Sequence, residues 1–131
     1  MRRAVRPGTI AMAALTVVGT VAGCVPISTV PAPAPAAEVE QAFAGHSYVG
    51  TLPDGSSVCI HHAEDGRFLG RAGGLVSGTW SVEEEGLCYA YVQGPPWFNC
   101  RQVALAGTRV VLLFAEIVIG EGHLAEGNVC A

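Results

Sequence analysis

The sequence contains no lysine. All seven of its basic residues are arginines, and Arg2, Arg3 and Arg6 lie at the extreme N-terminus. The other four arginines are scattered among eleven acidic residues. A nucleic-acid-binding domain presents a patch of positive charge along the phosphate backbone, and electrostatic attachment to anionic head groups needs clustered basic residues. The composition therefore argues against nucleic acid as a partner and against a membrane contact held by charge.

No long stretch repeats its apolar residues with the 3.6-residue period of a helix after Phe43. Short runs of β-branched and aromatic residues are instead separated by Gly, Pro and Asp clusters, a pattern typical of antiparallel strands joined by turns. We predict an all-β fold, a small antiparallel meander that closes into a barrel or a sandwich, over residues 43–131. The expected strands are His46–Leu52, Ser57–His62, Arg67–Arg71, Leu75–Val82, Leu87–Val92, Asn99–Leu105, Arg109–Ala115 and a short eighth one near Asn128–Cys130.

The N-terminal apolar stretch is too short to span a membrane. A spanning helix needs roughly 20 apolar residues, and the uncharged stretch Thr9–Val25 falls short of that length before Pro26 interrupts it. A basic start, a short apolar core and small residues before a cleavage point are the parts of a secretory signal. The stretch ends in Val21-Ala22-Gly23-Cys24, which resembles the lipobox of bacterial lipoproteins.

This resemblance implies that residues 1–23 are removed and that Cys24 is lipidated. Its thiol would take a diacylglyceryl group and its new α-amino group a further fatty acyl chain such as palmitate. Two or more chains anchor a protein stably where one chain does not. Because Val25 rather than aspartate follows the cysteine, the resemblance favours the outer membrane, with the protein facing the periplasm. A secretory signal that is cut elsewhere and a short uncleaved anchor are the alternatives.

Residues 24–42 form the predicted linker. Proline and alanine alternate between Pro31 and Ala36, and a residue that precedes proline avoids the helical region. We expect an extended tether that reaches on the order of 55 Å between Val25 and Ala42, at about 3.1 Å per residue.

Five cysteines are an odd number for an exported chain. If Cys24 carries lipid, then Cys59, Cys88, Cys100 and Cys130 remain, and four cysteines in a small exported domain are typical of two disulfides. Cys88 and Cys100 lie symmetrically about Gly94, so they would face each other in a hairpin that turns there. This spacing favours a Cys88–Cys100 bridge and leaves Cys59 to pair with Cys130.

The Gly94–Phe98 loop is the predicted contact with a partner. Two prolines stiffen it, and Trp97 and Phe98 follow them. Buried aromatic side chains often dominate binding energy, so this loop would contact an envelope protein or another ligand. The alternative is that Trp97 and Phe98 fold back as a lid on the barrel.

Catalytic and metal-binding motifs are absent. No serine lies in a Gly-x-Ser-x-Gly turn, and the sequence has no His-Glu-x-x-His or Cys-x-x-Cys pattern. The adjacent His61 and His62 would point to opposite faces of a strand. We therefore expect a lipid-anchored envelope lipoprotein that acts as a small binding or structural module, without catalysis, cofactor or metal. The alternative function is a metal-binding accessory protein of the periplasm that uses His46, His61 or His62, and Asp65.

Overall fold

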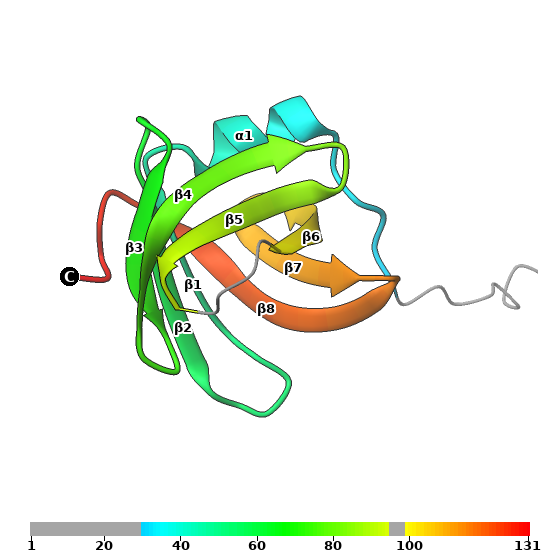
Figure 1. Ribbon diagram of the computed structural model, residues 1–131. Coiled ribbons are helices and arrows are strands. Elements are labelled where there is room, and N and C mark those ends of the chain that lie inside the picture. The colour runs from blue at the N-terminus through cyan, green and yellow to red at the C-terminus, as the bar shows by residue number, and fades with distance from the viewer. Residues whose placement is uncertain (1–29, 95–98) are drawn as a thin grey trace, which may run out of the picture.

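Eight antiparallel strands close into a barrel in the computed structural model, which describes residues 30–94 and 99–131 (Figure 1). Each strand pairs with the next one along the chain, and the last pairs with the first. The predicted meander is confirmed, and of the two closures it takes the barrel. The elements are α1 (Ala36–Phe43), β1 (His46–Thr51), β2 (Ser57–His62), β3 (Arg67–Ala72), β4 (Leu75–Glu83), β5 (Gly86–Gln93), β6 (Asn99–Ala106), β7 (Arg109–Phe114) and β8 (Ile117–Glu126).

The eighth strand is not where the sequence predicts it. Residues 128–130 form no strand, and β8 occupies Ile117–Glu126 instead. Gly120 and Gly122 weaken the strand pattern here because glycine has no side chain to pack. The barrel requires Gly122, since a Cβ there would lie 2.2 Å from the Val49 carbonyl oxygen of β1.

The extended chain predicted for residues 36–42 is also wrong. These residues form α1, which packs on β1, β4 and β5 and lies across the top of the barrel in Figure 1. Val39 and Phe43 on its inner face are fully buried. Just before the helix, the Ala34 amide donates a 2.7 Å hydrogen bond to the Val103 carbonyl of β6. Burial of this apolar stripe stabilises a helix of only eight residues, which would be unstable alone.

The barrel interior is filled by alternate residues of all eight strands, which point inward. The one polar group of the Trp80 side chain is paired, because the indole nitrogen donates to the Ala63 carbonyl at 2.9 Å. On β4 the side chains of Val76 and Trp80 are both buried in this core. Other members of this core are Tyr48, Val58, Ile60, Phe68, Leu87, Tyr89, Val103, Val110, Leu112 and Leu124.

Both favoured cysteine pairs are present. Cys88 on β5 and Cys100 on β6 are directly opposite each other in register and form a disulfide. The second disulfide joins Cys59 on β2 to Cys130 in the C-terminal tail. The tail lacks strand structure, so this bond and the Gly127 amide, which donates to the Gly45 carbonyl at 3.0 Å, hold it against the barrel.

Candidate functional site

Arg101 points into the barrel. It lies opposite Leu87, a fully buried residue, in the β5–β6 register. Its guanidinium carbon lies 5.2 Å from the centre of the Tyr89 ring, which is a cation–π arrangement. Its Nη2 donates to the side-chain oxygen of Asn99. Its Nε is buried and has no acceptor among the residues that the structure describes.

Tyr48 supplies a second buried donor without a partner. The side chain is 2% exposed, and its hydroxyl makes no hydrogen bond within the described chain. The hydroxyl lies beside Gly50 and Gly120, where a side chain would collide with it or crowd it. Burial raises the pKa of Tyr48 to about 12, although the charge of Arg101 acts in the opposite direction. The hydroxyl is therefore protonated at neutral pH and remains a donor.

These two donors are unusual for a barrel interior. A buried polar group that makes no hydrogen bond destabilises a fold by about 1–3 kcal/mol, and nearly all buried polar groups in proteins are paired. The described part of the interior therefore contains one N–H and one O–H donor that have no acceptor within the chain.

Arg101 also reaches an opening in the barrel wall. The β6–β7 pairing begins only at Gln102 with Leu113, so Asn99–Arg101 is not hydrogen-bonded to β7. An open surface hollow of about 490 Å³, which we call the β6–β7 slot, lies beside these strands. The slot is lined by Glu85, Asn99, Cys100, Arg101, Gln102, Leu113, Phe114 and Ala115.

The polar groups at the helix-covered end are paired and have a structural role. His62 is fully buried, and its Nε2 lies 2.6 Å from the Tyr89 hydroxyl. Its Nδ1 lies 3.4 Å from the His46 carbonyl, so Nδ1 carries the proton and Nε2 accepts from Tyr89. Burial lowers the pKa of His62 to about 3 and raises that of Tyr89. Both ring nitrogens of neutral His62 and the Tyr89 hydroxyl therefore have hydrogen-bond partners within the protein. This pair does not need a ligand to complete its hydrogen bonds.

Ser47 and His61 lie together on the outer wall without forming a catalytic pair. The Ser47 hydroxyl donates to the Gly127 carbonyl at 2.7 Å and accepts the Val129 amide at 3.2 Å. Because its single proton is used, the contact with His61 Nδ1 at 3.2 Å is donated by the histidine. Ser47 is completely buried, so it fastens the C-terminal tail and is not available as a nucleophile.

The histidines do not gather into a metal site in the described part of the chain. His61 and His62 face opposite sides of the wall, and His46 Nδ1 contacts the Ala44 carbonyl. Asp65 forms an exposed ion pair with Arg67 at 2.6 Å. The one group of potential ligands found within 4.8 Å in the described residues is Glu85 with Cys88 and Cys100. Both of these sulfurs are in a disulfide, so the group does not fit a metal ion.

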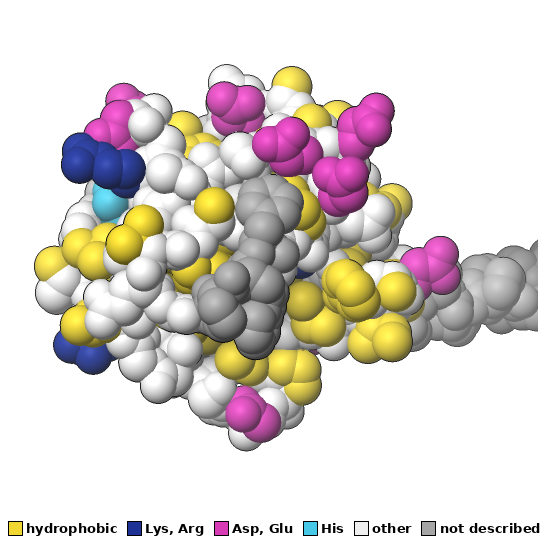
Figure 2. Space-filling model, in the orientation of Figure 1, with side chains coloured by type: hydrophobic (Ala, Val, Ile, Leu, Met, Phe, Trp, Pro, Cys, Tyr) yellow, Lys and Arg dark blue, Asp and Glu magenta, His cyan; other side chains and the backbone are white. Residues whose placement is uncertain are grey.

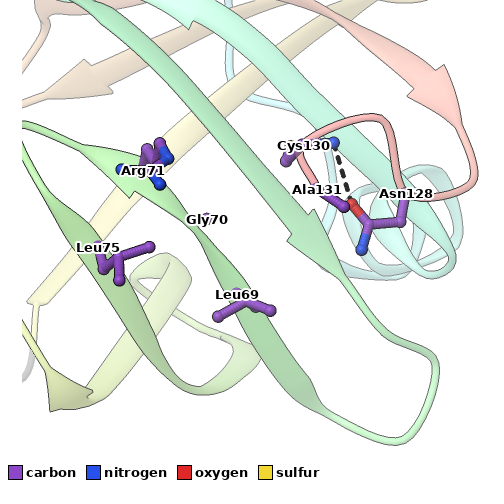
Figure 3. Close-up of a pocket in the computed structure, with 7 residues that line it drawn as sticks. All are labelled: Leu69, Gly70, Arg71, Leu75, Asn128, Cys130 and Ala131. Carbon is purple, nitrogen blue, oxygen red and sulfur yellow. Dashed lines mark hydrogen bonds between the residues drawn. The ribbon is translucent and has the colours of Figure 1, made fainter.

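A second groove lies on the outside of β3. Figure 3 shows Leu69, Arg71 and Leu75 on one side of it and the C-terminal residues on the other. Its volume is about 160 Å³. Arg71 is exposed to solvent, and no buried side chain with an unpaired polar atom faces the groove from the described residues. The groove thus lacks the directional groups that the β6–β7 slot has.

The surface carries mainly acidic charge on the face shown in Figure 2. Acidic side chains gather along its upper edge, where α1 and the β4–β5 turn lie. Glu83, Glu84 and Glu85 of that turn are all exposed, as expected for a solvated turn. No helix in the described residues is long and apolar enough to cross a membrane.

The site residues predicted from the sequence divide into two groups. Cys24, Trp97 and Phe98 lie outside the described residues, so the lipidation site and the aromatic loop remain predictions. The four paired cysteines are placed as expected. Tyr48 and Arg101 were not foreseen, although one signal was available for Arg101. If Cys100 faces outward to meet Cys88, its neighbour on the strand must face the interior.

Comparisons with protein-family models, with curated proteins and with solved structures find no significant match to this chain.

Proposed function

We propose that this protein is a lipid-anchored lipoprotein of the bacterial envelope that acts as a small binding module without catalysis. The lipobox-like Val21–Cys24 motif supports the anchor. The two disulfides support an oxidising compartment, because such bonds are rare in the reducing cytosol. In this proposal the acyl chains on Cys24 hold the protein at the outer membrane, and the barrel faces the periplasm, where it meets an envelope protein or another ligand.

The observation that carries the binding function is the unpaired state of Tyr48 and Arg101. A barrel with a purely structural role gains nothing from two buried donors that lack acceptors, since apolar side chains of similar size would fill the space without that penalty. A partner that brings acceptors to these groups would remove the penalty. The Trp97–Phe98 loop, which precedes β6, would add apolar contact with a partner.

Metabolic labelling with a palmitate analogue tests the anchor. We expect the wild-type protein to incorporate the label and the Cys24→Ala variant to incorporate none, because the thiol and the new amino group are both lost as acceptors. The Cys59→Ala variant is the matched control and should keep the label. Equal labelling of the wild-type and Cys24→Ala proteins would exclude the lipoprotein assignment.

Native mass spectrometry of the protein isolated from its envelope tests the binding function. We expect a fraction of the wild-type protein to carry a bound molecule or a partner, and this fraction to fall in the Arg101→Gln variant. The Arg109→Gln variant is the control, because Arg109 forms an exposed ion pair with Glu121 on the outer wall. Mass spectra that show only the bare protein, in gentle detergent and after crosslinking in the intact envelope, would contradict a binding module.

A further inference from the structure

We propose that the turn between β7 and β8 inserts Phe114 and Ile117 into the surface of the lipid bilayer that anchors the protein. We call residues Phe114–Ile117 the β7–β8 tip. This inference rests on the proposed lipid anchor and specifies which side of the barrel faces the membrane. It depends on three features of the described residues: the apolar side chains at the tip, the place where the linker joins the barrel, and the charge beside the tip.

The β7–β8 tip carries two large apolar side chains next to each other. Phe114 and Ile117 are directly opposite in the β7–β8 register, so their side chains lie on the same face of the hairpin. Phe114 is 62% exposed and Ile117 is 65% exposed, although residues of these types are usually buried. Figure 2 shows hydrophobic side chains gathered at the end of the barrel where β7 meets β8. Contiguous exposed apolar surface of this kind marks a site of contact with a membrane or a protein.

The linker joins the barrel beside the same part of β7. The Ala34 amide donates to the Val103 carbonyl of β6, and Val103 is the register partner of Leu112 on β7. Phe114 lies two residues beyond Leu112, which is about 7 Å farther along the strand at about 3.4 Å per residue. In Figure 1 the described chain begins on the side of the barrel where β7 meets β8. An anchor on the linker is therefore attached to the side of the barrel that carries the tip.

The length of the linker lets the tip touch the bilayer. Residues 25–33 lie between Cys24 and Ala34, and at about 3.1 Å per residue they reach on the order of 30 Å when extended. The tip is much nearer to Ala34 than this, so it meets the surface without stretching the linker. A short tether also keeps the tip at a high effective concentration beside the bilayer. Two side chains can then hold a contact that would be too weak in a protein without an anchor.

The charge beside the tip specifies a zwitterionic lipid surface. Glu116 stands in the turn itself, and Glu85 lines the β6–β7 slot together with Phe114. Both carboxylates are exposed, and the negative head groups of anionic lipids would repel them. The contact is therefore held by the two apolar side chains, and we expect it to be weaker on an anionic surface than on a zwitterionic one.

The test places a fluorescent probe at the tip of a membrane-anchored protein. The whole chain, with its two disulfides formed, is coupled through the Cys24 thiol to a maleimide phospholipid in phosphatidylcholine vesicles; the other four cysteines are in disulfides. Ile117→Trp carries the probe, and the emission of the native Trp80 and Trp97 is subtracted with the wild-type spectrum. Leu69→Trp is the matched control, because Leu69 is 54% exposed on β3. In the closed barrel β3 lies four strands from β7 in either direction.

We expect the Ile117→Trp emission to shift to shorter wavelength on the vesicles and to lose intensity when the acyl chains carry bromine. Bromine near the head-group end should quench more than bromine near the methyl end, because interfacial side chains are buried only about 5–10 Å into the head-group boundary. The Leu69→Trp probe should show neither effect. Adding Phe114→Ser to Ile117→Trp should reduce the quenching. Anionic phosphatidylglycerol vesicles should also reduce it, and Glu116→Gln should restore part of that loss.

Equal quenching of the two probes, or stronger quenching of Leu69→Trp, would overturn the membrane contact. A shift of the Ile117→Trp emission without vesicles, together with a doubled mass in sedimentation, would assign the tip to a second copy of the chain and would overturn it as well. Because the lipid is supplied chemically at Cys24, these results do not depend on lipidation in the cell. Absence of the palmitate label would contradict the lipoprotein assignment separately. The substituted side chains are exposed, so the unfolding midpoints of the variants should match that of the wild type.

Discussion

Two kinds of buried polar side chain occupy the same barrel interior and differ in their partners. His62 and Tyr89 satisfy each other, while Tyr48 and Arg101 are left with free donors. The first pair contributes to stability as it stands. The second pair lowers the stability of the empty protein and would recover that loss when an acceptor arrives.

The protonation of His62 gives a prediction about pH. Its pKa is lowered in the folded protein, from 6.5 to about 3, so between these values the unfolded chain binds a proton that the folded protein does not. Stability therefore rises with pH across this window and is lost as pH falls below 6.5. The expected slope is at most about 1.4 kcal/mol per pH unit. Urea unfolding at several values between pH 6.5 and pH 4.5 measures it.

The His62→Gln variant removes this dependence while keeping an acceptor for the Tyr89 hydroxyl. Its stability should change much less over the same range. His123→Gln is the control, because His123 is exposed, and it should keep the wild-type slope. Identical slopes for the wild-type protein and His62→Gln would show that His62 is not kept neutral by burial.

At the level of single residues, the sequence was informative where the strand period decides the outcome. The opposite orientation of His61 and His62 follows from strand alternation, and the pairing of Cys88 with Cys100 follows from their symmetric spacing about Gly94. Tyr48 and Arg101 could not be found in this way. Whether a buried donor has a partner depends on the register of non-adjacent strands, and one sequence does not contain that information.

Among the elements, α1 is the one whose role the sequence concealed. Residues 36–42 follow a Pro/Ala stretch, so the sequence predicts that the linker continues through them. They form a helix instead, because Val39 and Phe43 pack into the barrel core. The Phe43 ring is fully buried and meets the His62 ring edge-on, with the ring centres 5.0 Å apart. The helix thus belongs to the core.

Truncation of Phe43 tests that role. Phe43→Ala should lower the free energy of unfolding by about 3–5 kcal/mol, as expected for the loss of a buried aromatic ring. Glu40→Ala on the exposed face of the same helix is the control and should change it by less than about 0.5 kcal/mol. Chemical denaturation followed by circular dichroism gives both values. Equal, small effects would show that α1 is not required by the barrel.

The β7–β8 turn is strained by its residues. Ala115 and Glu116 have φ angles of 52° and 67°, the positive values that a two-residue type I′ turn needs and that Asn-Gly adopts best. The Ala115→Asn/Glu116→Gly double variant should raise the free energy of unfolding by about 1–2 kcal/mol. Glu116→Ala is the control and should not stabilise the protein. The measurement is urea unfolding. If the double variant is no more stable than the wild type, the positive φ angles at Ala115 and Glu116 do not strain the turn.

The elements that the sequence predicted are those with a local signal. Seven strands were placed within one or two residues because β-branched runs and Gly-rich turns mark them. β8 was missed because Gly120 and Gly122 remove the strand pattern, although the neighbouring β1 backbone leaves no room for a side chain at Gly122. Residues 128–130 form no strand, and Cys130 reaches Cys59 without strand pairing.

For the whole molecule, the disulfides differ in the length of chain that they close. Cys59–Cys130 spans 71 residues and Cys88–Cys100 spans 12. The chain-entropy model then gives stabilisations of about 4.4 and about 2.8 kcal/mol. We expect Cys59→Ala/Cys130→Ala to be the more destabilised double variant in urea unfolding. The reverse order would show that strain or residual structure outweighs chain entropy here.

The position of α1 also shortens the proposed tether. Because the Ala34 amide is bound to β6, at most residues 25–33 remain as a spacer between a lipidated Cys24 and the barrel. At about 3.1 Å per residue this reach is on the order of 30 Å, little more than half of the length expected from the sequence. The barrel would work close to the surface that anchors it.

The closure of the barrel by its first and last strands sets the order in which the protein can be completed. β1 pairs with β8 from His46 with Glu126 onward, and the second disulfide uses Cys130, the penultimate residue. Contacts between residues so far apart form slowly, because the loop between them must close first. Neither of these links can form until β8 and the segment that carries Cys130 have been made. Until then β1 and β2 lack these partners, and β1 presents an open strand edge.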